Sequence, residues 1–370
     1  MRIITCIITA RITASATVRF YKNSHKIRTS SRYWGYNPFL CLYGKSNHTV
    51  VLNSITAEEK MFDIFNKSTN FTINDIPDLQ GKIAIVTGAN TGIGFITAQE
   101  LARKNAHVFV ACRDQTKGEK AISEIKRVTG NDKVEYLPLN LSSLKSVLKA
   151  TELFLDRKLP LHILVNNAGI MATPFTLTED GIQDQFGINH IGHFLFTIKL
   201  LPTIEASAPS RIVNLTSLAH NRAPKCGIDF ENLNNPNAYG SFSRYGQSKL
   251  ANILFSLELN KRLADKEVYV NSVHPGVVKT DLYRNLKDSM GFLAKPIEMI
   301  TGLIMISSEE GAMTSLYCAT SPEIIEKNLR GKYFVPNGKL SNPEKSGTDE
   351  DLALKLWKYS EELINKKLNS

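Results

Sequence analysis

The chain has 370 residues, of which 42% are hydrophobic and 22% are charged, which suits one large globular domain with its own core. The formal net charge is +10, but residues 1–57 hold eight basic residues and no Asp or Glu, which leaves 37 basic against 35 acidic residues in the remainder. The remainder therefore lacks the positive charge of a nucleic-acid-binding domain. Five cysteines without a Cys-x-x-Cys pair indicate neither a zinc site nor a redox couple.

The basic N-terminal extension, residues 1–57, is rich in arginine, serine and threonine, as mitochondrial transit peptides are. A disordered arm and an over-extended gene start are alternatives with the same composition. The apolar run at 3–10 is too short for a membrane span, which needs about 20 apolar residues. We expect a cytoplasmic or mitochondrial protein without a transmembrane span, in which residues 58–79 link the extension to the folded domain.

Apolar runs of strand type alternate with helical stretches over residues 80–340. This alternation is typical of strands joined by crossover helices, which form a parallel sheet covered on both faces. We predict a single α/β domain with a doubly wound, parallel, seven-stranded sheet of Rossmann type. The strands are expected at 83–87, 107–111, 134–139, 162–165, 212–215, 269–273 and 333–335. In the segment 341–370, an amphipathic helix is expected over 349–368.

A glycine-rich turn follows the first predicted strand and precedes a helical stretch, with glycines at 88, 92 and 94. In this setting glycines permit positive φ and let a pyrophosphate approach bare backbone amides at the N-terminus of the helix. An ordinary tight turn between strand and helix is the alternative. The strand before the turn and the helix after it favour a dinucleotide-binding site.

Tyr245 and Lys249 are four residues apart in a helical stretch, so their side chains lie on one face, one turn apart. A tyrosine has a reference pKa of about 10, and a cation in a water-poor cleft favours its phenolate form. The pair can therefore exchange a proton near neutral pH. The spacing alone is common in helices, where it more often means a buried ring beside a lysine.

Thr-Gly-x-x-x-Gly-x-Gly at 87–94 and Tyr-x-x-x-Lys at 245–249 together resemble the short-chain dehydrogenase/reductase family. The resemblance covers about residues 80–340 and is supported by further landmarks in the family order. These landmarks are Asn166-Asn-Ala-Gly169, Asn189, Ser217, Pro275-Gly276 and Thr280.

Finer details resemble the retinol dehydrogenase branch of that family. They are Ala-Cys-Arg113-Asp, Asn189-His-Ile-Gly-His-Phe194 and Ser248-Lys-Leu-Ala-Asn252. The branch includes the oxidoreductase domain of the WW-domain-containing oxidoreductase. Trp34 and Trp357 are the only tryptophans here, so no WW domain is expected.

The resemblance implies hydride transfer between a nicotinamide cofactor and a carbonyl or alcohol, without a metal. Tyr245 would exchange the proton, Ser217 would hydrogen-bond the substrate oxygen, and Lys249 would lower the tyrosine pKa and hold the nicotinamide ribose. Asn189 would anchor a water that links the lysine to solvent. The cofactor-binding residues implied are Gly88, Asn90, Thr91, Gly92, Ile93, Gly94, Arg113, Asn140, Leu141, Asn167, Ala168, Gly169, Tyr245, Lys249, Pro275, Gly276 and Thr280.

The choice of cofactor depends on charge after the second strand. NAD-dependent relatives carry aspartate where this chain has Cys112, and Arg113 follows, which resembles the NADP-selective pattern and suits a 2′-phosphate. Asp114 lies at the spacing of a ribose-binding acid, but it is one position further on and could instead hold the arginine. We predict NADP over NAD. Asn140 stands where relatives have an aspartate that contacts adenine, and its amide oxygen can still accept a hydrogen bond.

The substrate is predicted only by class. The stretch 219–244 is long for the family, the stretch 285–307 is apolar, and both are expected to border the substrate cleft. A lipophilic carbonyl or alcohol, such as a retinoid, a steroid or a long-chain aldehyde, would suit such a border. A peripheral membrane contact and a homodimer interface are further uses of the apolar stretch.

Two other functions stay open on the sequence. One is an NADP-binding interaction protein with vestigial catalysis, which the intact Ser217, Tyr245 and Lys249 disfavour. The other is a sugar-nucleotide epimerase or dehydratase, whose usual Gly-x-x-Gly-x-x-Gly spacing differs from the turn found here. Several histidines also lack the paired ligands of a metal site and are interpreted as structural: His190, His193, His220 and His274.

Overall fold

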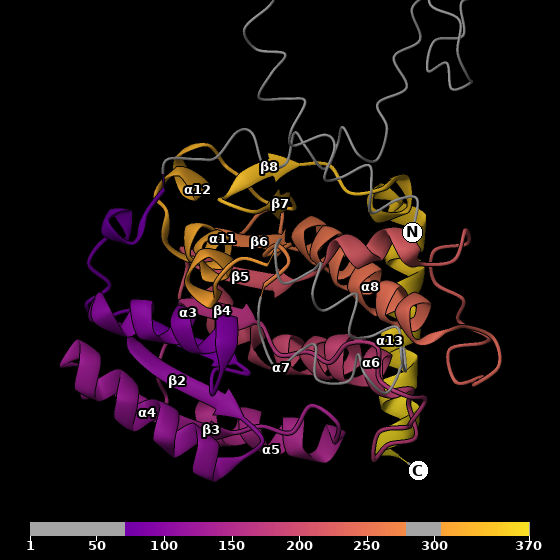
Figure 1. The fold of residues 1–370 in the computed structure, drawn as a ribbon, viewed down its shortest axis with the longest axis horizontal. Coiled ribbons are helices and arrows are strands. Elements are labelled where there is room, and N and C mark those ends of the chain that lie inside the picture. The colour runs from indigo at the N-terminus through magenta and orange to yellow at the C-terminus, as the bar shows by residue number, and fades with distance from the viewer. Residues whose placement is uncertain (1–70, 279–304, 370) are drawn as a thin grey trace, which may run out of the picture. The chain divides into compact units, whose positions relative to one another are not determined.

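The computed structural model describes residues 71–278 and 305–369, which form a single α/β domain around one sheet of eight strands (Figure 1). The strand order is β3-β2-β1-β4-β5-β6-β7-β8, and β1 to β7 are parallel. The chain builds outward from β1 to β3 and then from β4 to the opposite edge, which is the doubly wound topology. The strands are β1 (Ile83–Thr87), β2 (His107–Cys112), β3 (Val134–Pro138), β4 (Ile163–Asn166), β5 (Ser210–Leu215), β6 (Val268–Val273), β7 (Tyr333–Val335) and β8 (Lys339–Ser341).

Helices cover both faces of this sheet and form two apolar cores. One core contains side chains of α3, α4 and α11, and the other contains side chains of α5, α7, α8 and α13. The helices are α3 (Gly92–Arg103), α4 (Gln115–Thr129), α5 (Leu144–Leu155), α6 (Asp184–Phe186), α7 (Gly192–Ala206), α8 (Ser241–Arg262), α11 (Ser308–Thr320), α12 (Glu323–Glu326) and α13 (Glu350–Leu368). Across the described ranges, no helix is long and apolar enough to cross a membrane.

The central strands are apolar because helices cover them from both sides. Strands β1, β4, β5 and β6 are buried along their whole length, so apolar residues do not alternate with exposed polar ones along them, and β1 and β4 consist mainly of continuous apolar residues. All seven predicted strands are present, with ends that differ from the prediction by at most two residues. The predicted fold class is therefore confirmed.

The predicted number of strands was wrong by one, because β8 forms an antiparallel edge strand. It returns along β7 through a tight hairpin, in which Asn337 and Gly338 adopt φ values of 63° and 67°. Asn-Gly is a strong hairpin signal, since both residues tolerate positive φ. The strand was missed because its three residues are too few to show a periodic pattern, and Leu340 between two polar residues is exposed.

The helix α13 occupies Glu350–Leu368, and Asp349, the first residue of the stretch expected to be helical, caps its N-terminus. Its apolar face packs on α8 and α7. Trp357 meets Phe194 edge to face at 4.9 Å between ring centroids, and the Arg262 guanidinium lies 4.0 Å above the Trp357 ring. The aromatic contacts fix this helix against the two helices that carry the landmarks Asn189-to-Phe194 and Tyr245-to-Lys249.

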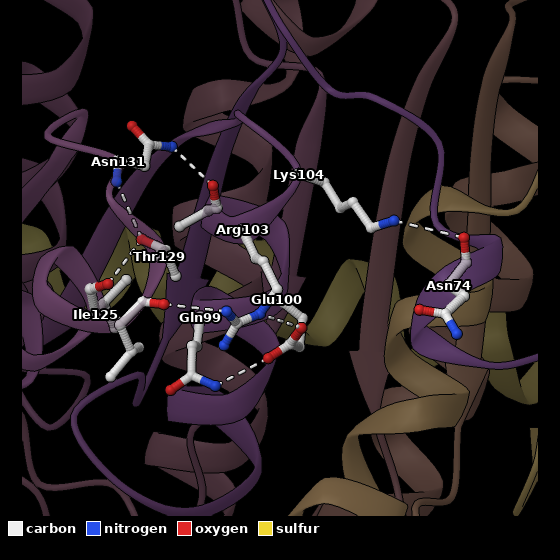
Figure 2. A network of polar contacts seen from close by, with 10 residues as sticks. Asn74, Gln99, Glu100, Arg103, Lys104, Ile125, Thr129 and Asn131 are labelled. Carbon is white, nitrogen blue, oxygen red and sulfur yellow. Dashed lines mark hydrogen bonds and ion pairs between the residues drawn. The ribbon is translucent and has the colours of Figure 1, made fainter.

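A polar network ties the end of α3 to the end of α4 (Figure 2). Glu100 is buried and accepts hydrogen bonds from Gln99 and from Arg103 Nε at 2.8 and 3.0 Å. Arg103 donates onward to the Val128 carbonyl, and Asn131 Nδ2 donates to two carbonyls at the end of α3. Because Arg103 and Asn131 each reach a carbonyl outside their own element, the network fixes the end of the helix that follows the glycine-rich turn.

Candidate active site

A cleft of about 470 Å³ lies at the carboxyl ends of the parallel strands, where open α/β sheets bind ligands. Pockets for cofactors and substrates typically measure about 300–1,000 Å³. The cleft is lined by these residues of the predicted site: Gly88, Asn90, Thr91, Gly92, Ile93, Gly94, Arg113, Asn140, Leu141, Asn167, Ala168, Gly169, Ser217, Tyr245, Lys249, Pro275 and Gly276. Thr280 lies outside the described residues, and Asn189 is buried behind the wall of the cleft.

The glycine-rich turn has the close backbone packing that the sequence motif implies. Gly88 and Gly92 adopt φ values of 65° and 58°, a region that L side chains rarely enter. A Cβ on Gly94 would lie 2.4 Å from Asn167 Nδ2 and 2.5 Å from the Gly88 carbonyl, so no side chain fits there. The turn therefore brings bare backbone and the N-terminus of α3 to the cleft, which suits the pyrophosphate of a dinucleotide.

Charges after β2 are arranged around the N-terminus of α4. Arg113 is exposed and lines the cleft, whereas the Asp114 carboxylate accepts from the Lys117 backbone N–H at 3.0 Å and caps the helix. The Lys117 ammonium lies 3.9 Å from Asp114 and also lines the cleft. Lys117 was missed in the sequence, although an aspartate three residues before it at a helix start was a usable signal.

Asn140 follows β3 and uses its side chain to shape the neighbouring loop. Its Oδ1 accepts from Ser142 N at 3.1 Å, and its Nδ2 donates to Glu179 at 2.9 Å. Its backbone N–H donates to Ser146 Oγ. The amide therefore holds the loop that borders the cleft, beside the predicted contact Leu141.

Tyr245 and Lys249 both emerge from α8 into the inner end of the cleft, with only 3% and 4% of their surface exposed. The lysine Nζ lies 5.7 Å from the centre of the tyrosine ring and donates to the Leu215 carbonyl at 3.1 Å. Burial lowers the pKa of Lys249 to about 8, so the ammonium is mostly retained at neutral pH. The helix thus places a cation next to a phenol in a largely dry pocket.

Ser217 follows β5 and is held by its own backbone neighbours. Its Oγ accepts from Ala219 N at 3.2 Å, which leaves the O–H to donate towards the cleft. His220 Nδ1 donates to the Ser217 carbonyl at 2.7 Å, and His220 Nε2 accepts from Glu344 N. The serine is therefore fixed from behind by a buried histidine that reaches the C-terminal segment.

Asn189 lies in a π-helical turn, Gly187–Ile191, between α6 and α7. Its side chain exchanges two hydrogen bonds of 2.9 Å with the backbone of Ile170 and donates a third to Ser248. A Cβ on Gly169 would lie 3.1 Å from Asn189 Oδ1 and 3.3 Å from Lys249 Nζ, so both groups border the same point. The structure therefore places the Asn189 side chain and the Lys249 ammonium around the same point, while the predicted role of Asn189 in anchoring a water stays a prediction.

The cleft also contains residues that the sequence did not single out for binding or catalysis. They include Lys117, Ser142, Met171, Ile188, Thr216 and His274. These residues belong to no motif of regular spacing, and only the folded chain shows that they line one cleft. Within residues 71–278 and 305–369, no group of three or more His, Cys, Asp or Glu side chains could hold a metal ion.

Comparisons with known proteins agree with this geometry. The family model for short chain dehydrogenases matches residues 82–229 and 233–291. The chain is 43% identical over 305 residues to an uncharacterised oxidoreductase of Schizosaccharomyces pombe, which covers 80% of this chain and 88% of the relative. It is 43% identical over 286 residues to retinol dehydrogenase 12 of Mus musculus, with coverage of 77% and 87%.

Among solved structures, an uncharacterised protein from Mycobacterium paratuberculosis shares 33% sequence identity and a TM-score of 0.63. The match covers 80% of this chain and 98% of the other. The chain therefore belongs to the short-chain dehydrogenase/reductase family of oxidoreductases, and its relatives include the retinol dehydrogenases that its motifs resemble.

Proposed function

We propose that this protein reduces a lipophilic aldehyde or ketone with NADPH, or oxidises the corresponding alcohol in reverse. The observation that carries the proposal is the shared cleft. A proton-transfer pair, Tyr245 and Lys249, lies at its inner end. Two exposed cations, Arg113 and Lys117, line the part of the cleft that would hold the 2′-phosphate of the nucleotide.

The side chains at the inner end can perform the proton chemistry of carbonyl reduction. A nicotinamide cofactor bound in the cleft would supply the hydride. Tyr245 would donate its proton to the substrate oxygen, and the Ser217 hydroxyl would donate a hydrogen bond to that oxygen as negative charge develops on it. The Lys249 ammonium would stabilise the phenolate that remains, because an opposite charge nearby favours the ionised form.

The preference for NADP rests on the charges around the start of α4. A 2′-phosphate would meet the guanidinium of Arg113 and the ammonium of Lys117, both exposed at the cleft. The one carboxylate nearby, Asp114, is engaged in capping α4 and in pairing with Lys117. Cys112 contributes no charge, since burial raises the pKa of its thiol to about 11.

The lipophilic substrate is supported by the apolar side chains around Tyr245. Met171, Ala172 and Tyr245 form a buried cluster, against which Ala219 and Phe242 pack. The last two belong to the stretch 219–244, which was expected to border the substrate. Most of the second expected stretch, 285–307, lies outside the described residues. Relatives named retinol dehydrogenase agree with an apolar substrate.

Cofactor choice is tested by titrating the full chain with NADPH and with NADH and following nucleotide fluorescence. We expect Arg113→Ala and Lys117→Ala to weaken NADPH binding by about tenfold or more each, because each removes a charge-assisted contact worth about 1.5–3 kcal/mol. Binding of NADH should stay within about twofold. Lys120→Ala is the matched control, since Lys120 is exposed on the same helix but outside the cleft.

Equal affinity of the wild type for NADH and NADPH would contradict the NADP assignment. The reaction is tested separately, by NADPH oxidation with aldehydes of increasing chain length and with ketones. Turnover that rises with chain length supports the lipophilic substrate class. Tight NADPH binding without turnover of any carbonyl would favour the interaction-protein alternative.

A further inference from the structure

A buried histidine beneath the cleft joins two parts of the site that are far apart in the sequence. His193 lies in the first turn of α7, is 2% exposed, and has no role in the reaction steps given above. Its Nδ1 is 3.0 Å from the Asn189 carbonyl oxygen, and its Nε2 is 2.8 Å from Thr87 Oγ1. Thr87 ends β1 immediately before the glycine-rich turn. A histidine bonded through both nitrogens is held in one orientation.

The positions of the hydrogens in this arrangement follow from the partners. A carbonyl only accepts, so Nδ1 of His193 carries the hydrogen, and in a neutral ring Nε2 must then accept. Thr87 Oγ1 must therefore donate to Nε2. Its oxygen in turn accepts the backbone N–H groups of Asn167 and Ala168, at 2.9 and 3.0 Å. We call these hydrogen bonds, from the Asn189 carbonyl through His193 to Thr87, the relay. Thr87 Oγ1 also lies 3.5 Å from the Val165 carbonyl, but His193 Nε2 at 2.8 Å is the nearer acceptor for its hydrogen.

At Asn189 the relay ends on the backbone carbonyl and not on the side-chain amide. The Asn189 amide is already bonded to the backbone of Ile170 and to Ser248, so His193 acts on the backbone carbonyl. In a π-helical turn, main-chain bonds run to the fifth residue and not to the fourth. The imidazole of His193, four residues after Asn189, therefore donates to the Asn189 carbonyl through its side chain.

We propose that His193 is a positioning residue for proton transfer, which holds the Asn189 turn in place and couples it through Thr87 to the cofactor-binding edge. The far end of the relay, Asn167 and Ala168, lines the cleft, and its near end borders the Lys249 ammonium. A displacement of Asn167 and Ala168 would therefore shift the Asn189 turn, and a displacement of that turn would shift Asn167 and Ala168. The inference rests on the proposed reductase function, because the Asn189 turn serves Tyr245 only in that reaction.

The charge around His193 favours the neutral ring that the relay requires. Burial lowers the pKa of His193 to about 4, with the hydrogen bond to the Asn189 carbonyl opposing this shift and the nearby Lys249 ammonium adding to it. A proton added to Nε2 would face a hydroxyl that is already accepting two N–H groups. The relay is therefore intact across the neutral pH range.

The first test compares two buried histidines on the same segment. His193→Phe removes the relay, whereas His190→Phe, in the same turn as Asn189, removes a bond to Ser360 on α13 and keeps the bond between His193 and the Asn189 carbonyl. We expect His193→Phe to lower kcat about tenfold or more, as small displacements of catalytic groups do, with KM for the carbonyl within about twofold. His190→Phe should lower the melting temperature comparably and leave kcat within about twofold. Equal kcat for the two variants would overturn the proposal.

The second test uses Thr87, so that the proposal stays testable if His193→Phe does not fold. Thr87→Val keeps the shape of the side chain and removes the hydroxyl, whereas Thr87→Ser keeps the hydroxyl. We expect Thr87→Val to lower kcat as His193→Phe does, Thr87→Ser to stay within about threefold of wild type, and the double variant Thr87→Val/His193→Phe to be no slower than either single one. Similar kcat for the valine and serine variants would contradict the relay.

A spectroscopic readout separates failure of this inference from failure of the proposed function. In the full chain labelled with ¹⁵N-histidine, His193 should show one Nδ1–H tautomer that does not titrate between pH 8 and pH 5, with the signal assigned by its loss in His193→Phe. An Nε2–H tautomer, or protonation above pH 6, would overturn the inference even in an active enzyme. Absence of wild-type turnover with this tautomer present would count against the proposed reductase and leave the relay intact.

Discussion

The two ends of the cleft are built from different kinds of contact. At the nucleotide end, Arg113 and Lys117 are exposed and held mainly by their place at the start of α4. At the catalytic end, Tyr245, Lys249 and Asn189 have at most 4% of their surface exposed. A change in an exposed charge alters which ligand binds and costs little stability, whereas a change in a buried polar group alters the fold and the chemistry together.

The difference also affects how easily residues at the two ends of the cleft can be substituted. Cofactor preference can change through one or two surface residues without repacking. The catalytic end depends on hydrogen bonds that link β1, β4, β5, α7 and α8, so its residues must change together or not at all.

The largest expected difference between the two ends follows from removing the proposed proton donor, Tyr245, alone. Tyr245→Phe should lower kcat by about 10²- to 10⁴-fold, because general acid catalysis contributes that much, while NADPH affinity changes less than about threefold. Steady-state kinetics and fluorescence titration measure the two quantities. Turnover that survives in Tyr245→Phe would assign the catalytic acid elsewhere in the cleft.

A second prediction separates the chemistry of Lys249 from its effect on stability. Lys249→Met should lower kcat by at least about 100-fold but raise the free energy of unfolding at pH 7 by up to about 3 kcal/mol, since the fold holds the ammonium at a pKa of about 8 against an ordinary 10.5. Because the unfolded chain binds more protons between pH 8 and 10.5, wild-type stability should rise over that range and the variant should not follow.

Denaturant unfolding from pH 7 to 10.5 measures this difference. Lys261→Met is the control, because Lys261 is exposed and pairs with Glu350 on the surface. Its unfolding free energy should stay within about 0.5 kcal/mol of wild type. A loss of stability in Lys249→Met comparable to a core truncation would show that the lysine stem, and not its charge, dominates the site.

The smallest expected effect per residue is the acid sensitivity of the buried histidines. Burial lowers the pKa of His190 and His274 to about 3 and that of His193 to about 4, against an ordinary 6.5. The unfolded chain then binds more protons below pH 6.5, so each histidine should remove about 2 kcal/mol of stability between pH 6.5 and pH 5. Urea unfolding at pH 8, 6.5 and 5 measures the sum.

In this experiment His190→Phe should lose less than one third of the pH dependence, because burial also lowers the pKa of His162 and His220. A stability that is flat from pH 6.5 to pH 5 would mean that the histidines titrate alike in the folded and unfolded chains. That result would contradict the contrast between a buried catalytic end and a solvent-exposed nucleotide end of the cleft.

The sequence predicts the parts of the fold that depend on local patterns. Fully buried strands such as β1 give uninterrupted apolar runs, and motifs of fixed spacing, such as Tyr245 and Lys249, identify the helix and its chemistry. The predicted cofactor contacts that can be located all line one cleft, while their individual roles stay predictions.

The remaining features depend on pairings that no local pattern records. His193 meets Thr87 across 106 residues, and His220 meets Glu344 across 124. Neither histidine has a neighbour in sequence that signals its partner, so both were interpreted as structural. Lys117 was missed for a different reason, because a lysine in the first turn of a helix usually only faces solvent.

The docking of α13 has a consequence for how the chain is made. This helix is synthesised after every strand and helix on which it packs, so Phe194 and Phe255, which meet Trp357, stand exposed on the nascent protein until α13 arrives. His190 likewise lacks its hydrogen-bond partner Ser360 until α13 has been synthesised. The helix bearing Tyr245 and Lys249 therefore reaches its final packing late in biosynthesis, and stalled translation would leave an apolar face open to aggregation.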